Sequence, residues 1–462
     1  MAAPFGSNGE LAPMTQPAAT LFDRTLDRLT RVLRDVAGSA RVRLTGQLRP
    51  DLPDDDLVRL KKQIDDCLNH PGGEVSQRAQ AAALGRAFLA LSGEGRRRFY
   101  TMLLNEYGTE REAVDAAMGQ VQAAADPAAR HKAERALAAC LRPPRLSLLT
   151  HFNALPEGVK FLVDLRADLQ AHVKDDRALK PLDDELRDLL AGWFDIGFLD
   201  LERITWSASA TLLEKLIAYE AVHEIRSWTD LKNRLDSDRR CFAFFHPRMP
   251  EEPLIFVEVA LTQGIAASVQ ALLDEQAPAL DTARADTAIF YSISNCQRGL
   301  AGVSFGDFLI KRVVDRLSHE LPQLKLYSTL SPIPGFRDWF DRTQAADHPA
   351  LAAGLAEADW HLDPARSAAL AAPLTRLCAR YLAEEKANGR ALDRVAHFHL
   401  SNGARIEQVN WLGDTSAAGL AQAYGLMVNY RYKLDEIDGN HEAYVAEGTV
   451  ATSSAVRKLL KG

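Results

Sequence analysis

Residues 287–317 read TAIFYSISNCQRGLAGVSFGDFLIKRVVDRL, and this stretch decides the fold. It begins with TAIFYSIS (287–294), a run of apolar and β-branched residues typical of a buried strand. A glycine-bearing loop follows at residues 295–306. Apolar residues then recur at helical spacing until Pro322, which predicts an amphipathic helix. The residues on its apolar face are Ile310, Val313, Val314 and Leu317.

Further strand patterns lie on both sides of this segment. Residues 253–262 (PLIFVEVALT) form a near-continuous apolar run and predict a second buried strand. Residues 324–330 predict a third, short strand. Residues 395–400 and 405–412 flank Ser401-Asn402-Gly403, a turn sequence typical of a hairpin, so we expect a strand on each side of it.

Two more helices are expected in the same region. One starts near Pro373 and carries Leu374, Leu377 and Tyr381. The last major helix opens near Asp414, and its apolar face runs through Leu420, Tyr424 and Met427. Strands, a glycine loop, a helix and more strands in this order predict an α+β unit with a mixed sheet.

The N-terminal part of the chain has a different texture. Residues 1–20 are rich in Ala, Pro, Gly and Thr and are expected to form a flexible tail. Residues 21–192 are rich in Ala, Leu and Arg and predict an all-helical domain, with Phe22, Leu26, Leu29 and Leu33 on one helical face. A chain of 462 residues is too long for one ordinary core, so residues 193–462 are expected to form a second domain.

Composition excludes several classes of protein. The net charge of −7 argues against nucleic-acid binding, which needs a broad basic excess. No apolar run reaches membrane-spanning length, and no basic segment followed by an apolar one marks a secretory signal. The five cysteines are scattered, odd in number and without a CxxC pair, which indicates reduced thiols in a cytoplasmic protein and no zinc site.

Four short constellations are candidates for chemistry. Glycines in residues 297–306 leave backbone N–H groups near a helix start, where phosphate binds well, although a plain turn explains the pattern equally. Ser331 lies in a rigid loop with Pro332, Pro334 and Gly335, and either caps a turn or serves a site.

The other two constellations contain histidine and tyrosine. Strand alternation is expected to place His397 and His399 on one face, opposite Ala396, Phe398 and Leu400. A histidine there suits general acid–base chemistry, and plain packing is the alternative. No acidic or cysteine partner lies at metal-ligand spacing. Residues 429–432 (NYRY) close the last predicted helix, where a tyrosine either packs or positions a substrate oxygen.

In order and wording, these segments resemble the malonyl-CoA decarboxylase family. The matching stretches are HPRMPEEPLIFVEVALT (246–262), YSIS (291–294), GLAGVSFGDFLIKRVV (299–314), STLSPIPGF (328–336), HFHLSNGA (397–404), VNWLGD (409–414) and GLMVNYRY (425–432). SPIPGF and FHLxNGA are highly specific in combination. The helical region matches more loosely, through GVKFLVDL (158–165).

The resemblance implies a helical N-terminal domain joined to a catalytic domain of the GNAT acyltransferase type. It also implies that Ser331 and His399 are catalytic and that Ser292 and Tyr432 line the same pocket. The CoA loop falls on Ala301, Gly302, Val303, Ser304, Phe305, Gly306 and Asp307. Some family members carry a glutamate where this chain has Ser304, so no catalytic carboxylate is expected at that position.

The implied reaction converts malonyl-CoA to acetyl-CoA and carbon dioxide. No cofactor or metal is expected, because the thioester carbonyl is itself the electron sink. His399 is expected to protonate the enolate, and Ser331 to hydrogen-bond with the malonyl group and with His399. A homodimer or homotetramer assembled through helices of residues 21–190 is expected. A GNAT-type acyltransferase and a non-catalytic acyl-CoA sensor remain alternatives.

Overall fold

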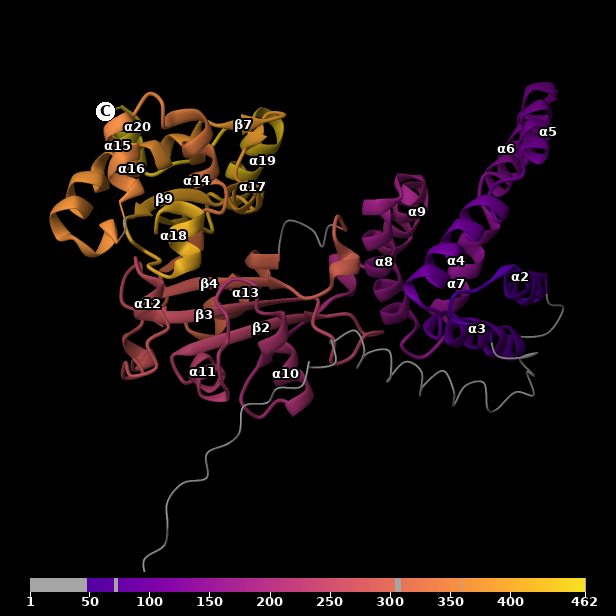
Figure 1. The fold of residues 1–462 in the computed structure, drawn as a ribbon, viewed down its shortest axis with the longest axis horizontal. Coiled ribbons are helices and arrows are strands. Elements are labelled where there is room, and N and C mark those ends of the chain that lie inside the picture. The colour runs from indigo at the N-terminus through magenta and orange to yellow at the C-terminus, as the bar shows by residue number, and fades with distance from the viewer. Residues whose placement is uncertain (1–47, 70–73, 304–308, 358, 462) are drawn as a thin grey trace, which may run out of the picture. The chain divides into compact units, whose positions relative to one another are not determined.

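The computed structural model describes residues 48–69, 74–303, 309–357 and 359–461 (Figure 1). The predicted tail at residues 1–20 and the predicted helical face from Phe22 to Leu33 lie outside these residues. The chain divides into two compact units, Met1–Leu186 and Arg187–Gly462. Among the described residues, no helix is long and apolar enough to cross a membrane.

The described part of the first unit is built from helices around an aromatic core. Phe88 contacts the rings of Phe99, Tyr100 and Phe161, and Phe161 also contacts Phe152. The helices are α2 (Asp54–Asn69), α3 (Glu74–Leu89), α4 (Gly93–Glu106), α5 (Arg111–Ala123), α6 (Pro127–Cys140), α7 (Pro144–Asn153), α8 (Gly158–Asp175) and α9 (Lys180–Ala191), the last of which ends just beyond the unit.

Helices α5 and α6 form an antiparallel hairpin that extends beyond the other helices of the unit (Figure 1). Asp126 caps α6 through a hydrogen bond from the Ala129 amide, and Pro127 occupies the first turn, where no intrahelical donor is lost. Only Ala117 and Ala133 are buried in the two helices. Most of the hairpin surface is therefore exposed in a single chain.

The second unit contains the predicted mixed sheet. Its strand order is β1-β2-β3-β4-β5-β10-β6, and β9 pairs with β10 as a branch. The strands are β1 (Asp200–Ile204), β2 (Arg239–Phe245), β3 (Ile255–Thr262), β4 (Thr287–Asn295), β5 (Leu326–Thr329), β6 (Ser331–Pro332), β9 (Arg405–Asn410) and β10 (Met427–Arg431). Among the strand pairs of the described residues, β4–β5 is the parallel one, and α13 (Leu309–Glu320) makes the crossover between these two strands. The sheet confirms the predicted α+β class.

Helices cover both faces of this sheet. Leu212, Leu213 and Leu216 of α10 (Ala210–Tyr219) pack on the face that carries Cys241 and Phe245 of β2. Arg312 of α13 lies over the Phe244 ring, which alternation places on the opposite face. The remaining helices are α11 (Trp228–Arg234), α12 (Val269–Leu272), α14 (Phe336–Trp339), α15 (Pro349–Ala356), α16 (Pro364–Ala383), α17 (Arg394–Ser401), α18 (Ala417–Ala423), α19 (Ile437–Glu447) and α20 (Ser454–Lys461), beside a small β7–β8 pair (Lys386–Ala387 with Arg390–Ala391).

The sheet opens at the end of β5. Parallel pairing with β4 stops at Phe290 and Thr329, and Ser331 instead pairs with Val428 of β10. On the other side of β4, the register with β3 shifts, so that Tyr291 has no direct partner strand residue. Such a bulge bends its strand and re-aims side chains. The opening and the bulge create the space that holds the candidate site.

The predicted hairpin at residues 395–412 is wrong in its first half. Residues 395–400 belong to α17, because the Asp393 carboxylate caps that helix by accepting from the Val395 and Ala396 amides. Gly403 adopts φ +77° just after the helix, the left-handed conformation that closes many helices. The turn signal is therefore a helix end, and a helix replaces the first strand.

The last predicted helix is also too long. α18 ends at Ala423, because Tyr424 and Gly425 both take positive φ values, and the chain then enters β10. Met427 and residues 429–432 are therefore in or beside a strand rather than on a helix. The helix expected near Pro373 begins earlier, at Pro364, where Asp363 caps α16.

Candidate active site

Ser331 and His399 lie in contact at the opening of the sheet. Ser331 comes from β6 and His399 from α17, 68 residues later. The Ser331 Oγ is 3.2 Å from the His399 Nε2, and both residues are buried. The position of α17 and the change of partner strand after β5 thus bring together Ser331 and His399, two of the residues that the sequence singles out.

Aromatic side chains enclose the His399 ring. Its Nδ1 is 2.8 Å from the Tyr432 hydroxyl, and its face stacks on the Tyr430 ring with centroids 4.6 Å apart. Because the ring is buried and burial disfavours its charged form, the pKa of His399 falls to about 3. The imidazole is therefore neutral at physiological pH.

A chain of hydrogen bonds sets the position of the imidazole proton. The Ser331 hydroxyl donates to the Thr329 Oγ1 at 2.8 Å, and the Tyr430 amide donates to the same oxygen at 3.0 Å. With its own proton so directed, Ser331 accepts from the His399 Nε2. The Tyr432 hydroxyl then donates to the Nδ1, so the network favours the tautomer that is protonated on Nε2.

A cavity of about 430 Å³ opens in front of this pair. Its walls come from β4, the loop after β6, α17, α18 and the loop at residues 220–224. The residues that line it include His223, Phe290, Tyr291, Ser331, Arg394, His399 and Asp414. Phe290 and Tyr291 are consecutive residues, and both reach the cavity because the bulge interrupts the alternation of β4.

Two of the other predicted site residues support the cavity from outside it. Tyr432 lies behind His399 and contacts its Nδ1. Ser292 is not among the residues that line the cavity, and its Oγ donates to the Glu220 carboxylate at 2.8 Å. Both residues are buried.

The glycine loop is described only in part. Ala301, Gly302 and Val303 follow the short turn at Arg298–Leu300, and Gly302 has φ +76°, which favours glycine. Ser304, Phe305, Gly306 and Asp307 lie outside the described residues. Lys311, in the first turn of α13 after this loop, forms an ion pair with Asp438.

His397 does not share a face with His399, because both residues are on a helix and not on a strand. The Nδ1 of His397 is 2.9 Å from the Tyr444 hydroxyl, and His397 is not among the residues that line the cavity. No group of three or more potential metal-ligating side chains occurs among the described residues.

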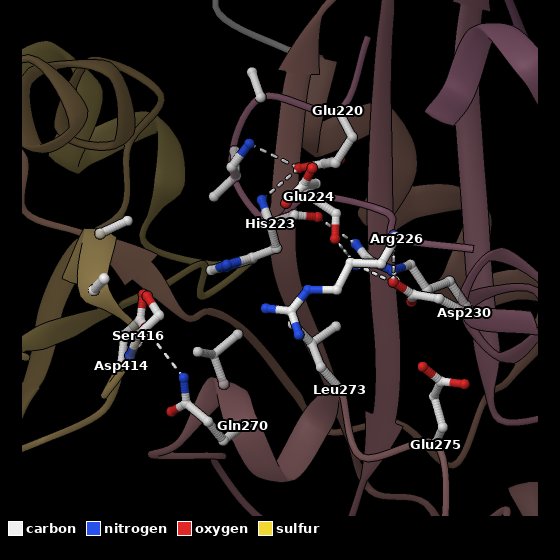
Figure 2. A pocket seen from close by; sticks show the side chains of 16 residues that line it. Glu220, His223, Glu224, Arg226, Asp230, Gln270, Leu273, Glu275, Asp414 and Ser416 are labelled. Carbon is white, nitrogen blue, oxygen red and sulfur yellow. Dashed lines mark hydrogen bonds and ion pairs between the residues drawn. The ribbon is translucent and has the colours of Figure 1, made fainter. Parts of the chain in front are cut away.

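No motif in the sequence marks Glu220 or His223, and Thr329 lies in the STLSPIPGF stretch without being singled out there, although all three contribute to this region. Glu220 and His223 lie in a short segment, EAVHE (220–224), between α10 and α11. The presence of ionisable residues in this short loop is the one feature of the sequence that points to a role for Glu220 and His223. A second cavity of about 540 Å³ shares Ala221, Val222, His223, Asp414 and Ala418 with the first (Figure 2).

Comparisons with known proteins identify the family of this chain. The family model described as the malonyl-CoA decarboxylase C-terminal domain matches residues 197–462, and the model of the N-terminal domain matches residues 107–194. The chain belongs to the malonyl-CoA decarboxylase family. The family resemblance found in the sequence is therefore confirmed.

Similar proteins come from animals and bacteria. Mitochondrial malonyl-CoA decarboxylase of Anser anser anser is 40% identical over 348 residues, which cover 68% of this chain and 69% of that protein. The Mus musculus protein of the same name is 39% identical over 371 residues, 73% of this chain and 75% of that one. Crystal structures of malonyl-CoA decarboxylases from Rhodopseudomonas palustris and Agrobacterium vitis superpose with TM-scores of 0.82 and 0.81, at 40% and 41% identity, each covering 87% of this chain and 99% of that one.

The buried imidazole should remain neutral between about pH 8 and about pH 5. A solvated histidine titrates near 6.5, and the lowered pKa of His399 puts its protonation well below this window. With histidine labelled by carbon-13 at Cε1, the NMR signal absent from His399→Asn should not move across the window. A shift of that signal with a midpoint near pH 6.5 would contradict the buried, neutral state.

Proposed function

We propose that this chain decarboxylates malonyl-CoA and that His399 delivers the proton that completes the reaction. The observation that carries the proposal is the chain of hydrogen bonds from Tyr432 through His399 to Ser331, at the wall of a cavity. Membership of the malonyl-CoA decarboxylase family supports the choice of substrate.

The reaction consumes one proton. The bond between C2 of the malonyl group and its carboxyl carbon breaks, carbon dioxide leaves, and the electron pair moves into the thioester as an enolate. The enolate C2 then takes a proton from the His399 Nε2 and becomes the methyl group of acetyl-CoA. The proton is later replaced from solvent, so atoms and charges balance.

A neutral imidazole is suited to this step. A thioester enolate is a much stronger base than an imidazolate, so the transfer from Nε2 to carbon is downhill. Other enzymes also use neutral histidine as a proton donor or electrophile. The Tyr432 hydroxyl keeps the ring proton on Nε2 and is assigned a positioning role.

Ser331 and the β4 bulge are assigned to the acyl group. The Ser331 hydroxyl is held by Thr329 and can turn to a malonyl oxygen when substrate enters. Tyr291 has no partner residue on β3, so a backbone N–H at the bulge is the candidate donor to the enolate oxygen. Fixed donors of this kind favour the transition state because they need no reorganisation.

The CoA moiety is assigned to residues 301–307, where the chain carries its glycine loop before α13. The positive φ of Gly302 supports this assignment, because a residue without a side chain lets a ligand approach the backbone. Ser292 is assigned a supporting role through Glu220. No catalytic duty is given to Ser304.

The direct test is incubation of the purified protein with malonyl-CoA alone. Carbon dioxide and acetyl-CoA should appear in equal amounts without added metal, cofactor or acyl acceptor. An acyltransferase would turn over only when an amine is supplied, and an acyl-CoA sensor would bind the compound unchanged. Either of these results would refute the proposed function.

Replacement of the two neighbouring histidines tests the assignment of the proton donor. His399→Asn should lower kcat by about 10²–10⁴-fold, the range that a positioned acid contributes, while acetyl-CoA still binds. His397→Asn is the matched control, because His397 contacts Tyr444 away from the cavity. Equal activity of the two variants would show that His399 is not the donor.

A symmetric homo-oligomer in the cytoplasm is part of the same proposal. All five cysteines are free thiols, which suits a reducing compartment, although the animal relatives are named mitochondrial proteins. The exposed α5–α6 hairpin offers a helical surface for contact between copies.

Light scattering at micromolar concentration tests the assembly. The full chain should give the mass of a dimer or a tetramer of 50.9 kDa subunits. A chain without α5 and α6 should form particles with fewer subunits than the full chain does. The mass of a monomer for the full chain, or an unchanged oligomer after the deletion, would contradict this part of the proposal.

A further inference from the structure

His223 faces the candidate active site from the wall that belongs to neither Ser331 nor His399. It lines the same cavity as both of them, and its side chain is 9% exposed. Its Nε2 is buried and has no hydrogen-bond partner within the described residues. A buried polar atom without a partner is costly, and its usual explanation is a ligand or a functional role.

The loop that carries His223 is fixed from both ends. The Glu220 carboxylate accepts from the amides of Val222 and His223, and from the hydroxyls of Ser292 and Ser294. Arg234 donates to the His223 carbonyl at 2.8 Å. These contacts fix the backbone of the loop, and from it the His223 side chain lines both cavities.

Arg234 is itself anchored in the core. Its side chain is 2% exposed and forms ion pairs with Asp230 and with Glu258 of β3. Burial is the main reason that the pKa of Glu258 rises to about 8, with the Glu220 charge adding to the rise and Arg234 opposing it. The Arg234 guanidinium thus connects the loop to Glu258 of the sheet.

Charged side chains of both signs lie around His223. Figure 2 shows its ring directed into the second cavity from the loop, with Asp414 and Ser416 on the facing wall. Burial lowers the pKa of His223, while the carboxylates of Glu220 and Asp414 and the Tyr291 backbone act in the opposite direction. Burial has the larger effect, so the ring enters the reaction neutral.

The carboxylates of Glu220 and Asp414 indicate whether the thioester oxygen or the carboxylate of the malonyl group lies beside His223. Negative charge builds up on the thioester oxygen during the reaction, and the carboxylates of Glu220 and Asp414 would oppose it at this wall. The substrate carboxylate behaves in the opposite way, since its charge disappears as carbon dioxide forms. Repulsion from the Glu220 and Asp414 carboxylates therefore destabilises the bound substrate more than the transition state, which favours reaction.

We propose that the His223 Nε2–H donates a hydrogen bond to the carboxylate of the malonyl group and selects malonyl-CoA over acetyl-CoA. The inference rests on the proposed function, because the proposed function places C2 of the malonyl group beside His399. A neutral donor orients the carboxylate without the strong stabilisation that a cation would give it. Arg394 also lines the cavity and is the rival partner for that carboxylate.

Binding measurements in a variant without turnover test this assignment. In the His399→Asn background, His223→Asn should weaken the binding of malonyl-CoA about tenfold, as expected for loss of a hydrogen bond to a charged group. The affinity for acetyl-CoA, which lacks the carboxylate, should change less than about twofold. Calorimetry with both ligands gives the two values.

Two further variants separate the hydrogen bond from other roles. His223→Gln should restore most of the affinity for malonyl-CoA, because its amide nitrogen reaches about as far as the histidine Nε2. Arg394→Gln should affect malonyl-CoA and acetyl-CoA alike. If Arg394→Gln instead showed the selective loss, the carboxylate would belong to Arg394.

Equal changes for malonyl-CoA and acetyl-CoA in His223→Asn, or no change for either, would overturn the role of His223. Equal loss in the Asn and Gln variants would do the same. None of these results touches the proposed function, which fails only if the wild-type protein releases no carbon dioxide from malonyl-CoA. The two failures are therefore distinguishable.

Discussion

The parallel pairing between β4 and β5 ends at Phe290 and Thr329, and the candidate site depends on where it ends. If β5 continued beside β4, ladder hydrogen bonds would fill the space that is now a cavity. Instead β6 turns to β10, which places Ser331 next to the strand that leads to Tyr432. The bulge at Tyr291 widens the opening from the other side. Backbone topology thus creates the site before any catalytic side chain is considered.

The histidines on the two sides of this opening are both buried, and they differ in the hydrogen bonds that their ring nitrogens make. Around His399, burial keeps the imidazole neutral, and both of its nitrogens are hydrogen-bonded. Around His223, burial leaves one nitrogen without a described partner. Arg234 and Glu220 hold that arrangement, and removal of one member of a buried ion pair typically costs about 3–5 kcal/mol. The contacts of Arg234 and Glu220 therefore hold the His223 loop in the conformation that keeps its side chain buried.

The sequence predicted the sheet better than it predicted the residues around the site. Continuous apolar runs identify β3 and β4, and helical periodicity identifies α13, because each of these elements is buried along its length or along one face. The strand predicted for the α17 segment was wrong for a local reason, because HFHLS alternates like a strand. The helix that forms instead depends on the Asp393 cap and on Gly403. Motif resemblance still singled out Ser331 and His399, whereas His223 carries no motif, and its loop is held by Glu220 contacts with Ser292 and Ser294, which lie 72 and 74 positions later.

A crystal structure of the wild-type protein with acetyl-CoA tests the central claim most directly. The account predicts that the acetyl group lies in the cavity between β4 and β6, with its methyl carbon beside the His399 Nε2 and its thioester oxygen toward the β4 bulge. The space between the methyl group and His223 should be large enough for the missing carboxylate. An acetyl group bound outside this cavity, or a thioester oxygen directed at Glu220 and Asp414, would contradict the account.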